Sequence, residues 1–448
     1  MDADFVERLD RADAIVKSNP EKAVAIYDGI LAETENMSPR ALYGKARAKD
    51  QLSEKNKSNA LLKEAIELFK SVLELGEAAP DALFRMAGVR CAERMQFRGW
   101  GNKAIAVLQK LIARFPEDSQ LRNDLGVQYL MVGHNRYAKE VFERELKRNP
   151  GNGFASAHLG FVLKSEGDLA GGAMLLQQGI ASGQEGAAQG KFYYHLGEAF
   201  QRLGRKADSD KVFSDGVAAG IFPSFWQRSL YNVDGLMAKP VWTLQETSYE
   251  FGLKVLQFNW EKIKAEAMAL LRSDKFEEEG ENLRDTGRWG QYDLYSQGKI
   301  TANCKEAVVT CALIEQVRES YAVVSNRYGT RYELGSRFLQ IAAAKSCTRG
   351  QVKFSVMYPG THVHPHTGPT NCRLRAHLGL SVDKADEEKM TLRVADKTLR
   401  WREGEVFVFD DSFEHEVRHD GQKKRVVLIV DLWHPDLSEE QRKTLSPI

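Results

Sequence analysis

The stretch HVHPHTGPTNCRLRAHLGL, residues 362–380, gathers four histidines and two arginines within nineteen residues. Imidazoles are common metal ligands, and guanidiniums bind carboxylates through two parallel hydrogen bonds. The stretch therefore allows three interpretations: a metal site, an anion site, or a histidine-rich loop that leads into a strand.

A strand is predicted over CRLRAHLGL, where side chains alternate between two faces. This period of two places Arg373, Arg375 and His377 on one face and leucines on the other. The strand RVVLIVD likewise places Arg425 on one face with two β-branched residues. A cavity lined by these cations would bind an acidic small molecule. From the two arginines of the first strand alone, the favoured interpretation is a solvated face.

The order of further residues indicates a metal site. His366 precedes the first strand, His415 follows 49 residues later in FDDSFEHEV, and Arg425 lies ten residues beyond. Non-haem iron oxygenases use this order, with two imidazoles on Fe(II) and a later basic residue on the distal carboxylate of 2-oxoglutarate. Their usual third ligand is a carboxylate two residues after the first histidine, where this chain has Gly368.

Length and composition are those of an ordinary globular protein. The 448 residues predict two or three domains, and 43% hydrophobic with 28% charged residues is typical of soluble chains. A net charge of +1 argues against nucleic acid or an anionic membrane as a partner. The acidic, amphipathic start MDADFVERLDRADAIV predicts no secretory signal, and the absence of a run of about 18 apolar residues predicts no membrane span. The chain is therefore either cytosolic or a piece of a longer precursor.

The first half is predicted to consist of repeated helix pairs. Leu-Gly pairs stand at 125–126, 159–160 and 196–197, and Pro116 and Pro150 are also 34 residues apart. A period of 34 residues, with small residues where paired helices touch, is typical of tetratricopeptide repeats. Such pairs stack into a solenoid with a concave surface, because one pair cannot bury its apolar face alone. A plain helical bundle is the alternative.

The repeat stops near residues 222–242, where aromatic residues and prolines appear. We therefore place helical repeats over 1–225 and a second domain over 226–448. Within the second domain, 226–300 is predicted as a helical lead-in, because SYEFGLKVLQFNWEKIKAEAMALLRS is amphipathic. Short strands separated by Gly, Pro and Asp-Gly turns over 301–448 favour a jelly roll or a similar barrel.

Five cysteines in a chain of this length do not make a disulfide framework. Cys304 and Cys311 form a close pair in NCKEAVVTC, while Cys91, Cys347 and Cys372 stand alone. On these observations two reduced thiols are favoured for the close pair, since most soluble chains are intracellular.

The motifs HPHTGPTNCRLRAHLGL, FDDSFEHEV and LIVDLWHPDL resemble the aspartyl/asparaginyl β-hydroxylase family. The likeness continues through WQRSLYNV and CKEAVVTC into the repeats, and it is strongest to the animal, endoplasmic-reticulum type. It implies a multidomain α + β protein: an α-helical tetratricopeptide solenoid followed by a double-stranded β-helix (jelly-roll) oxygenase domain. It also implies a 2-oxoglutarate-dependent dioxygenase that uses Fe(II) and O2 to hydroxylate the β-carbon of Asp or Asn in epidermal-growth-factor-like domains of proteins.

The resemblance also assigns roles to individual residues. His366 and His415 become the iron ligands, and the position at Gly368 is left to water because the family lacks the carboxylate ligand. The implied 2-oxoglutarate contacts are Trp289, Ser355, Arg375, His377 and Arg425, and the implied partners of the substrate's acidic side chain are Lys353 and Arg373.

Cys304 and Cys311 match a family disulfide, which reverses the expectation of reduced thiols and implies an oxidising compartment, the endoplasmic reticulum lumen. We expect no nucleic acid partner and no membrane contact from this chain itself, and leave open whether an anchor precedes Met1 in the natural protein. The segment 317–345 is longer than the family's usual connection, which leaves fine specificity open.

Several alternatives stay open. Asp411, four residues before His415, is a candidate substitute ligand, although orienting an imidazole or a bound water is the favoured role. His362 and His364 are expected to be exposed to solvent. Rival functions are an Fe(II)/2-oxoglutarate halogenase, because a glycine in the ligand position can admit chloride, a lipid or small-molecule hydroxylase, and a non-catalytic tetratricopeptide scaffold with an inert barrel.

Overall fold

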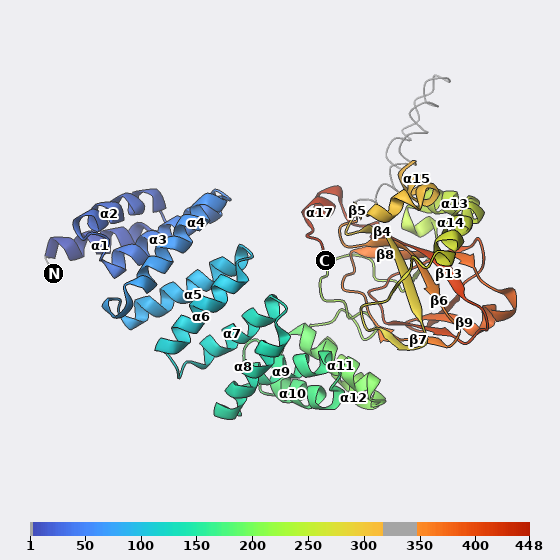
Figure 1. The fold of residues 1–448 in the computed structure, drawn as a ribbon, viewed down its shortest axis with the longest axis horizontal. Helices are drawn as coiled ribbons and strands as arrows, with labels where there is room; N and C mark the ends of the chain where they lie inside the picture. Colours follow the sequence, from blue (N-terminus) through green and yellow to red (C-terminus); the bar gives the residue numbers. More distant parts are fainter. Residues whose placement is uncertain (1–2, 317–346) are drawn as a thin grey trace, which may run out of the picture. The chain divides into compact units, whose positions relative to one another are not determined.

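The computed structural model describes residues 3–316 and 347–448. The chain divides into two compact units, 1–192 and 193–448, of which the first is helical and the second contains the β-sheets (Figure 1). The long connection at 317–345 lies outside the described residues, so the prediction about it stays a prediction.

The helices of the first part of the chain follow one another as antiparallel pairs. Six of them begin after a residue whose side chain accepts a hydrogen bond from the first turn, as Asn19, Ser38 and Asp118 do. The helices are α1 (Ala3–Ile15), α2 (Pro20–Glu33), α3 (Pro39–Lys55), α4 (Asn59–Glu74), α5 (Asp81–Phe97), α6 (Gly101–Arg114), α7 (Ser119–Met131), α8 (Asn135–Arg148), α9 (Gly153–Ser165), α10 (Leu169–Ala181), α11 (Gly190–Arg202) and α12 (Lys206–Ala218).

Glycines of the repeated Leu-Gly pairs lie where two helices touch. A Cβ on Gly126 of α7 would meet the ring of Phe142 on α8. A Cβ on Gly160 of α9 would lie 2.7 Å from the backbone nitrogen of Leu176 on α10. Close helix contact therefore requires small residues at this period, as the repeat pattern predicts.

The last predicted repeat belongs to the second compact unit. Residues 193–218, which include most of α11 and all of α12, fall on the far side of the division at 192/193, whereas the repeat pattern places the boundary at 225/226. The physical reason is side-chain bonding to the sheet region. Gln201 donates to Glu414 over 2.9 Å, and Arg202 donates to the carbonyl of Asn282 over 2.9 Å.

Two antiparallel sheets form the core of the second unit. Among the described residues the larger has the order β1-β11-β8-β13-β6-β4-β2, with β5 beside β4, and the smaller has the order β10-β9-β12-β7-β3. The strands are β1 (Val241–Trp242), β2 (Glu277–Glu278), β3 (Arg284–Thr286), β4 (Trp289–Ser296), β5 (Lys299–Ile300), β6 (Gln351–Met357), β7 (Thr361–His366), β8 (Arg373–Ser381), β9 (Met390–Val394), β10 (Lys397–Arg400), β11 (Val406–Phe409), β12 (His415–His419) and β13 (Arg425–Trp433).

The central strand β13 is buried on both faces. Val426 and Leu428 share a hydrophobic cluster with α13 (Glu250–Phe258) and α14 (Trp260–Arg272), which cover the larger sheet (Figure 1). Val427 and Ile429 belong to a second cluster with residues of β7, β9 and β12, which lies between the two sheets. Alternate side chains of β13 therefore face the covering helices and the space between the two sheets, and the site lies in that space.

The sheets begin earlier in the chain than residue 301. β4 pairs with β6 from Trp289 opposite Met357 to Ser296 opposite Gln351, within the segment 226–300 predicted as a helical lead-in. The stretch WGQYDLYS has the aromatic residues and the burial alternation of a strand. The helical prediction is correct for α13 and α14 and wrong for residues 289–296, which alternate as a half-buried strand does.

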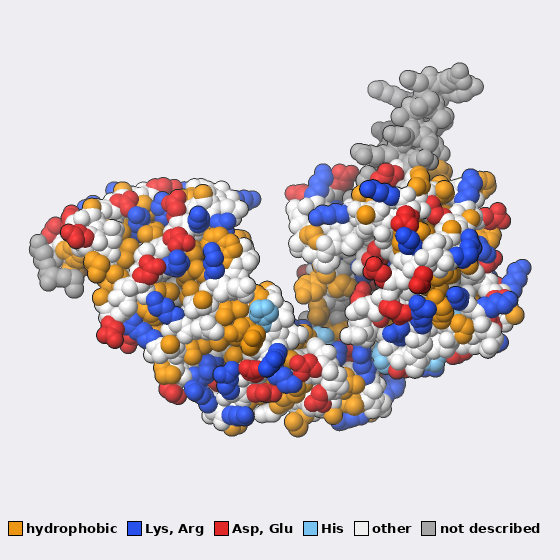
Figure 2. Space-filling view, viewed as in Figure 1, with side chains coloured by type: hydrophobic (Ala, Val, Ile, Leu, Met, Phe, Trp, Pro, Cys, Tyr) orange, Lys and Arg blue, Asp and Glu red, His pale blue; other side chains and the backbone are white. Residues whose placement is uncertain are grey.

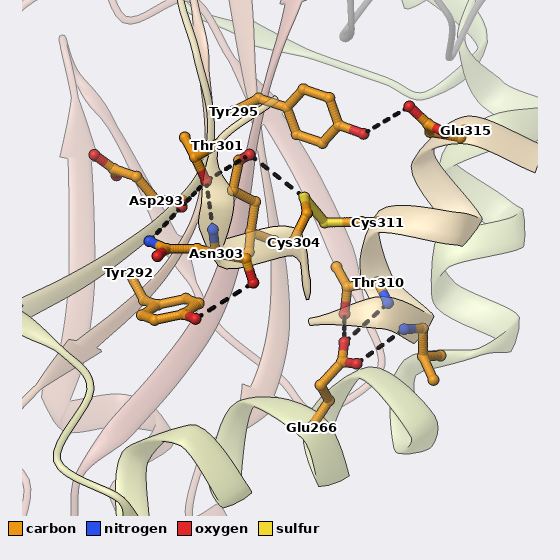
Figure 3. The surroundings of a disulfide bond; sticks show 12 residues. Glu266, Tyr292, Asp293, Tyr295, Thr301, Asn303, Cys304, Thr310, Cys311 and Glu315 are labelled. Atoms are coloured by element: carbon orange, nitrogen blue, oxygen red, sulfur yellow. Dashed lines mark hydrogen bonds between the residues drawn. A yellow bond between two sulfur atoms is a disulfide. The ribbon is translucent and has the colours of Figure 1, made fainter. Parts of the chain in front are cut away.

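A disulfide joins Cys304 to Cys311, which confirms the family-based pairing (Figure 3). Cys304 lies in a short 3-10 helix and Cys311 lies in α15 (Val308–Gln316). Glu266 on α14 accepts hydrogen bonds from the backbone N–H groups of Val309 and Thr310 at the start of α15, each over 2.9 Å (Figure 3). A carboxylate at a helix N-terminus is favourable, so the disulfide and this cap together fix α15.

Among the described helices, none combines the length and the apolar character needed to cross a membrane. On the face drawn in Figure 2, lysines and arginines are interspersed with aspartates and glutamates.

We predict opposite effects for two helical glycine-to-alanine changes. Gly160→Ala should lower the free energy of unfolding by about 1–3 kcal/mol, because the new methyl meets the backbone of α10. Gly29→Ala in α2 should raise it by about 0.5–1 kcal/mol, since its nearest neighbour would be Arg8 Nη2 at 3.7 Å and alanine favours the helix. Urea unfolding followed by circular dichroism tests both, and equal stabilisation by the two changes would contradict the helix contact.

Candidate active site

Two histidines meet at the adjoining ends of neighbouring strands. His366 ends β7, His415 begins β12, and the register of the smaller sheet places them directly opposite each other. Their ring centroids are 4.2 Å apart. Strand pairing therefore brings together the two imidazoles that the motif order assigned to one metal.

Both imidazoles are held in the same tautomer. Nδ1 of His366 lies 2.7 Å from the carbonyl oxygen of His364, and Nδ1 of His415 lies 2.9 Å from that of Phe413. A carbonyl only accepts, so Nδ1 carries the proton and Nε2 keeps its lone pair. Burial lowers the pKa of both histidines below the usual value, so both are neutral at pH 7. This is the state in which histidine binds metals.

The position of the expected third ligand is closed by another carboxylate. A Cβ on Gly368 would lie 2.5 Å from Oδ2 of Asp411. That carboxylate is fully buried and accepts from Arg373 Nη2 over 2.6 Å. The two backbone carbonyls orient the imidazoles and Asp411 instead holds a guanidinium, so the expectation is wrong for an imidazole. That Asp411 orients a bound water stays a prediction.

Across residues 3–316 and 347–448, no three His, Cys, Asp or Glu side chains are arranged to hold a metal ion together. His366 and His415, which both keep the Nε2 lone pair, are the pair of imidazoles that could hold a metal here.

A buried ionic network lies beside the histidines. Asp431 on β13 accepts from Arg375 Nε over 2.7 Å and from Arg375 Nη2 over 2.9 Å. Arg373 Nη1 lies 3.4 Å from the same carboxylate. Burial alone would raise the pKa of Asp431, but the two guanidiniums outweigh it and hold that pKa below its usual range. The inward face of β8 is thus charged and paired, and the alternative of a solvated face is wrong.

Arg425 differs from these arginines because no carboxylate pairs with it in the described part of the chain. Its side chain is buried at 1% exposure, and its guanidinium lies 4.2 Å from the ring centre of Trp401. Nη2 is 3.5 Å from Ser355 Oγ, while Nε and Nη1 have no hydrogen-bond partner among the described residues. Burial lowers the pKa of Arg425 to about 9. A buried cation with unpaired donors is unfavourable, so the arrangement fits a ligand carboxylate.

His377 and Trp289 surround the same region. The indole Nε1 of Trp401 donates to His377 Nδ1 over 3.1 Å, and an indole only donates, so the His377 proton is on Nε2. That Nε2–H is buried and unpaired among the described residues, and it can donate to an anion. Trp289 Nε1 donates to Ser355 Oγ over 2.9 Å.

A cavity of about 290 Å³ opens at the histidines. Of the residues proposed from the sequence, Ser355, His377 and Arg425 are not in its lining, and Ser355 is connected to it through Trp289. The proposed residues that do line the cavity are Trp289, Lys353, His366, Arg373, Arg375 and His415.

The lining also contains residues that no sequence pattern had indicated, among them Glu281, Gln291 and Ile448. Gln291 could have been found, because it lies two residues after Trp289 and therefore on the same face of β4. Lys353 Nζ donates to Gln291 Oε1 over 2.7 Å. Ile448 carries no local sequence signal, since three-dimensional folding alone brings it to the cavity.

Comparisons with known proteins point to one family. Residues 257–435 match the model of a family described as aspartyl/asparaginyl beta-hydroxylase. The mouse protein named aspartyl/asparaginyl beta-hydroxylase is 43% identical over 444 residues, which cover 98% of this chain and 56% of the mouse protein. For the human protein of that name the identity is also 43%, covering 98% of this chain and 55% of the human protein. The chain thus spans about half the length of the curated relatives it matches.

Among solved structures, a tetratricopeptide repeat protein from Parabacteroides merdae aligns with a TM-score of 0.37 and 15% identity, over 48% of this chain and 79% of that chain.

We predict that Asp431→Asn will lower the free energy of unfolding of the second unit by about 3–5 kcal/mol at pH 7, because it leaves Arg373 and Arg375 with one carboxylate fewer. The native pKa of Asp431 is depressed, so its contribution is present above the unfolded value of about 4 and is lost as the pH falls below it. The difference from the unaltered chain should therefore shrink in acid. Urea titrations at pH 7 and at a pH below about 4 test this.

The matched control is Asp396→Asn, which removes an exposed aspartate paired with Lys397. It should leave unfolding unchanged at both pH values, because exposed ion pairs contribute little. An equal response to the two substitutions would contradict a special role for Asp431.

Proposed function

The chain belongs to the aspartyl/asparaginyl beta-hydroxylase family, and from that premise we propose that it is a 2-oxoglutarate-dependent dioxygenase. The proposed reaction uses Fe(II) and O2 to hydroxylate the β-carbon of Asp or Asn residues in proteins. The observation that carries the proposal is Arg425, a buried guanidinium whose Nε and Nη1 have no partner within residues 3–316 and 347–448. It lies in the same barrel as two histidines that both offer Nε2.

His366 and His415 would hold the metal through Nε2. When bound, Fe(II) and 2-oxoglutarate supply the oxidising chemistry, which the protein itself has no group to perform. The protein's part is to fix both imidazoles in the ligating tautomer and to keep them neutral through burial. Because Gly368 offers no carboxylate, the remaining ligand positions are left to the cosubstrate, water and oxygen.

Arg425 and Ser355 would bind the distal carboxylate of 2-oxoglutarate. The stack on Trp401 holds the guanidinium in place, and His377 Nε2–H adds a neutral donor nearby. Neither Nε nor Nη1 has a partner among the described residues, so a carboxylate on either side of the guanidinium would form charge-assisted hydrogen bonds. Arg375, already paired with Asp431, would contact the end of 2-oxoglutarate that lies nearer the metal.

Lys353 is a better partner than Arg373 for the acidic side chain of a substrate. Arg373 already bonds Asp411 and the carbonyl of Arg349 and lies 3.4 Å from Asp431. Lys353 is buried at 4% exposure, and its bond to the neutral Gln291 uses one of three donors. An ammonium without a paired carboxylate is free to bind one from the substrate.

We propose epidermal-growth-factor-like domains as substrates and the endoplasmic reticulum lumen as the compartment. The disulfide between Cys304 and Cys311 supports an oxidising compartment. A helical repeat array supports a protein substrate, since such arrays present extended binding surfaces that a lipid or small molecule does not need. Chloride beside Gly368 would face the Asp411 carboxylate, which disfavours the halogenase. The unpaired charge of Arg425 disfavours an inert barrel.

The first test is mass spectrometry of an epidermal-growth-factor-like peptide after incubation with the chain, Fe(II), 2-oxoglutarate and O2. We expect one added oxygen on an Asp or Asn and succinate release, both abolished by His366→Ala. The control is His362→Ala, which alters the same strand where the imidazole pairs with Asp420 over 2.8 Å. No oxygen gain and no succinate would refute the proposal, and chlorinated product with chloride present would favour the halogenase.

A second test concerns the cosubstrate. Arg425→Met should raise KM for 2-oxoglutarate by about 100-fold, because the lost group would be the buried partner of a carboxylate. Arg418→Met, on strand β12 of the smaller sheet and with an exposed side chain, should leave that KM unchanged. Steady-state succinate release measures both, and an unaltered KM in Arg425→Met would remove Arg425 from the cosubstrate site.

A further inference from the structure

Helix α11 forms hydrogen bonds to the residues next to both histidines. The backbone N–H of Thr367, which follows His366, donates to Tyr194 Oη over 3.4 Å. Gln201 Nε2 donates over 2.9 Å to Oε2 of Glu414, the residue before His415. Tyr194 and Gln201 are seven residues apart, so they lie on one face of the helix, about 10.5 Å apart along its axis. One helix face thus contacts both ligand-bearing segments.

Glu414 is the most heavily bonded residue of this contact. It is 5% exposed, and its carboxylate accepts from Arg228 Nη2 over 2.5 Å and from Arg393 Nη2 over 2.7 Å, in addition to Gln201. Its backbone N–H donates to the carbonyl of Trp226 over 2.7 Å. Glu414 does not line the cavity, so these bonds hold the backbone from outside it.

The linker that follows α12 bonds to the same two segments. The N–H groups of Leu230 and Tyr231 donate to the carbonyl of Pro369, over 3.2 and 2.9 Å. The N–H of Arg228 donates to the carbonyl of Ser412 over 3.3 Å. These acceptors lie three residues after the first histidine and three residues before the second. The linker therefore connects both segments independently of the ladder between β7 and β12.

We propose that α11, the linker at 224–233 and Glu414 form a positioning clamp that sets the separation and orientation of the two imidazoles. The His415 ring takes its orientation from the carbonyl of Phe413, and the clamp fixes the backbone immediately after that carbonyl. The metal-binding geometry then depends on residues outside the family-matched region 257–435. The inference rests on the proposed function in taking the histidines as metal ligands.

Metal binding by the full chain tests the clamp without turnover. We would titrate Co(II) alone and record the affinity and the visible absorption spectrum. Glu414→Gln should weaken affinity about 10- to 100-fold, as loss of residues that orient metal ligands does, and Gln201→Leu roughly tenfold at most. Both should alter the spectrum, because the ligand geometry changes.

Two matched controls separate positioning from general destabilisation. Glu145→Gln neutralises an equally buried glutamate, 0% exposed and bonded to Arg122, in the helical repeats. Gln178→Leu removes a glutamine that donates to the carbonyl of Pro150. Both controls should bind Co(II) as the unaltered chain does, even where thermal melting shows lower stability.

The outcomes distinguish the inference from the proposed function. Unaltered affinity and spectrum in Glu414→Gln and Gln201→Leu would overturn the clamp and leave the proposed function in place. An equal loss in the controls would also overturn it. Absence of Co(II) binding to the unaltered chain would overturn both ideas. If Glu414→Gln does not fold, Gln201→Leu decides alone, because its side chain is only half-buried.

Discussion

The interior of the barrel depends on two buried carboxylates, Asp411 and Asp431, which hold Arg373 and Arg375 against the inner face of the larger sheet. Without them β8 could not turn two guanidiniums inward, since an uncompensated buried charge is strongly unfavourable. The pairing also separates two kinds of cation. The charges of Arg373 and Arg375 are already compensated by carboxylates, whereas Arg425 and Lys353 keep donors that have no partner among the described residues. A single ionic network thus separates compensated from uncompensated cations.

The histidines are positioned from two directions. The ladder between β7 and β12 sets them opposite each other, and bonds from α11 and the linker hold the segments that follow one histidine and precede the other. This explains why the second compact unit starts at residue 193, inside the last predicted repeat. The repeat pattern correctly predicts the helix pairs. The division at 192/193 instead follows the side-chain hydrogen bonds that join α11 to the second unit.

Local patterns in the sequence predicted much of this. The period of two placed Arg373, Arg375 and His377 on one face, and the 34-residue period placed glycines at helix contacts. The sequence could not show hydrogen bonds between side chains that lie far apart in the chain. Arg228 and Gln201 reach Glu414 across 186 and 213 residues, and no local signal marks such pairs. The strand at 289–296 was overlooked for a different reason, because the helices before it dominate the pattern of 226–300.

Gly368, where a carboxylate ligand was expected, affects the charge of the site. In a facial triad one anionic oxygen and two imidazoles surround the metal, but here the protein offers two neutral imidazoles alone. The carboxylate nearest to Gly368, that of Asp411, is committed to Arg373, so it compensates an arginine rather than the metal. Under the proposed function the site therefore keeps more positive charge, from the metal and from Lys353. Such a site favours an acidic side chain beside a doubly charged cosubstrate, and a carboxylate ligand at position 368 would weaken both attractions.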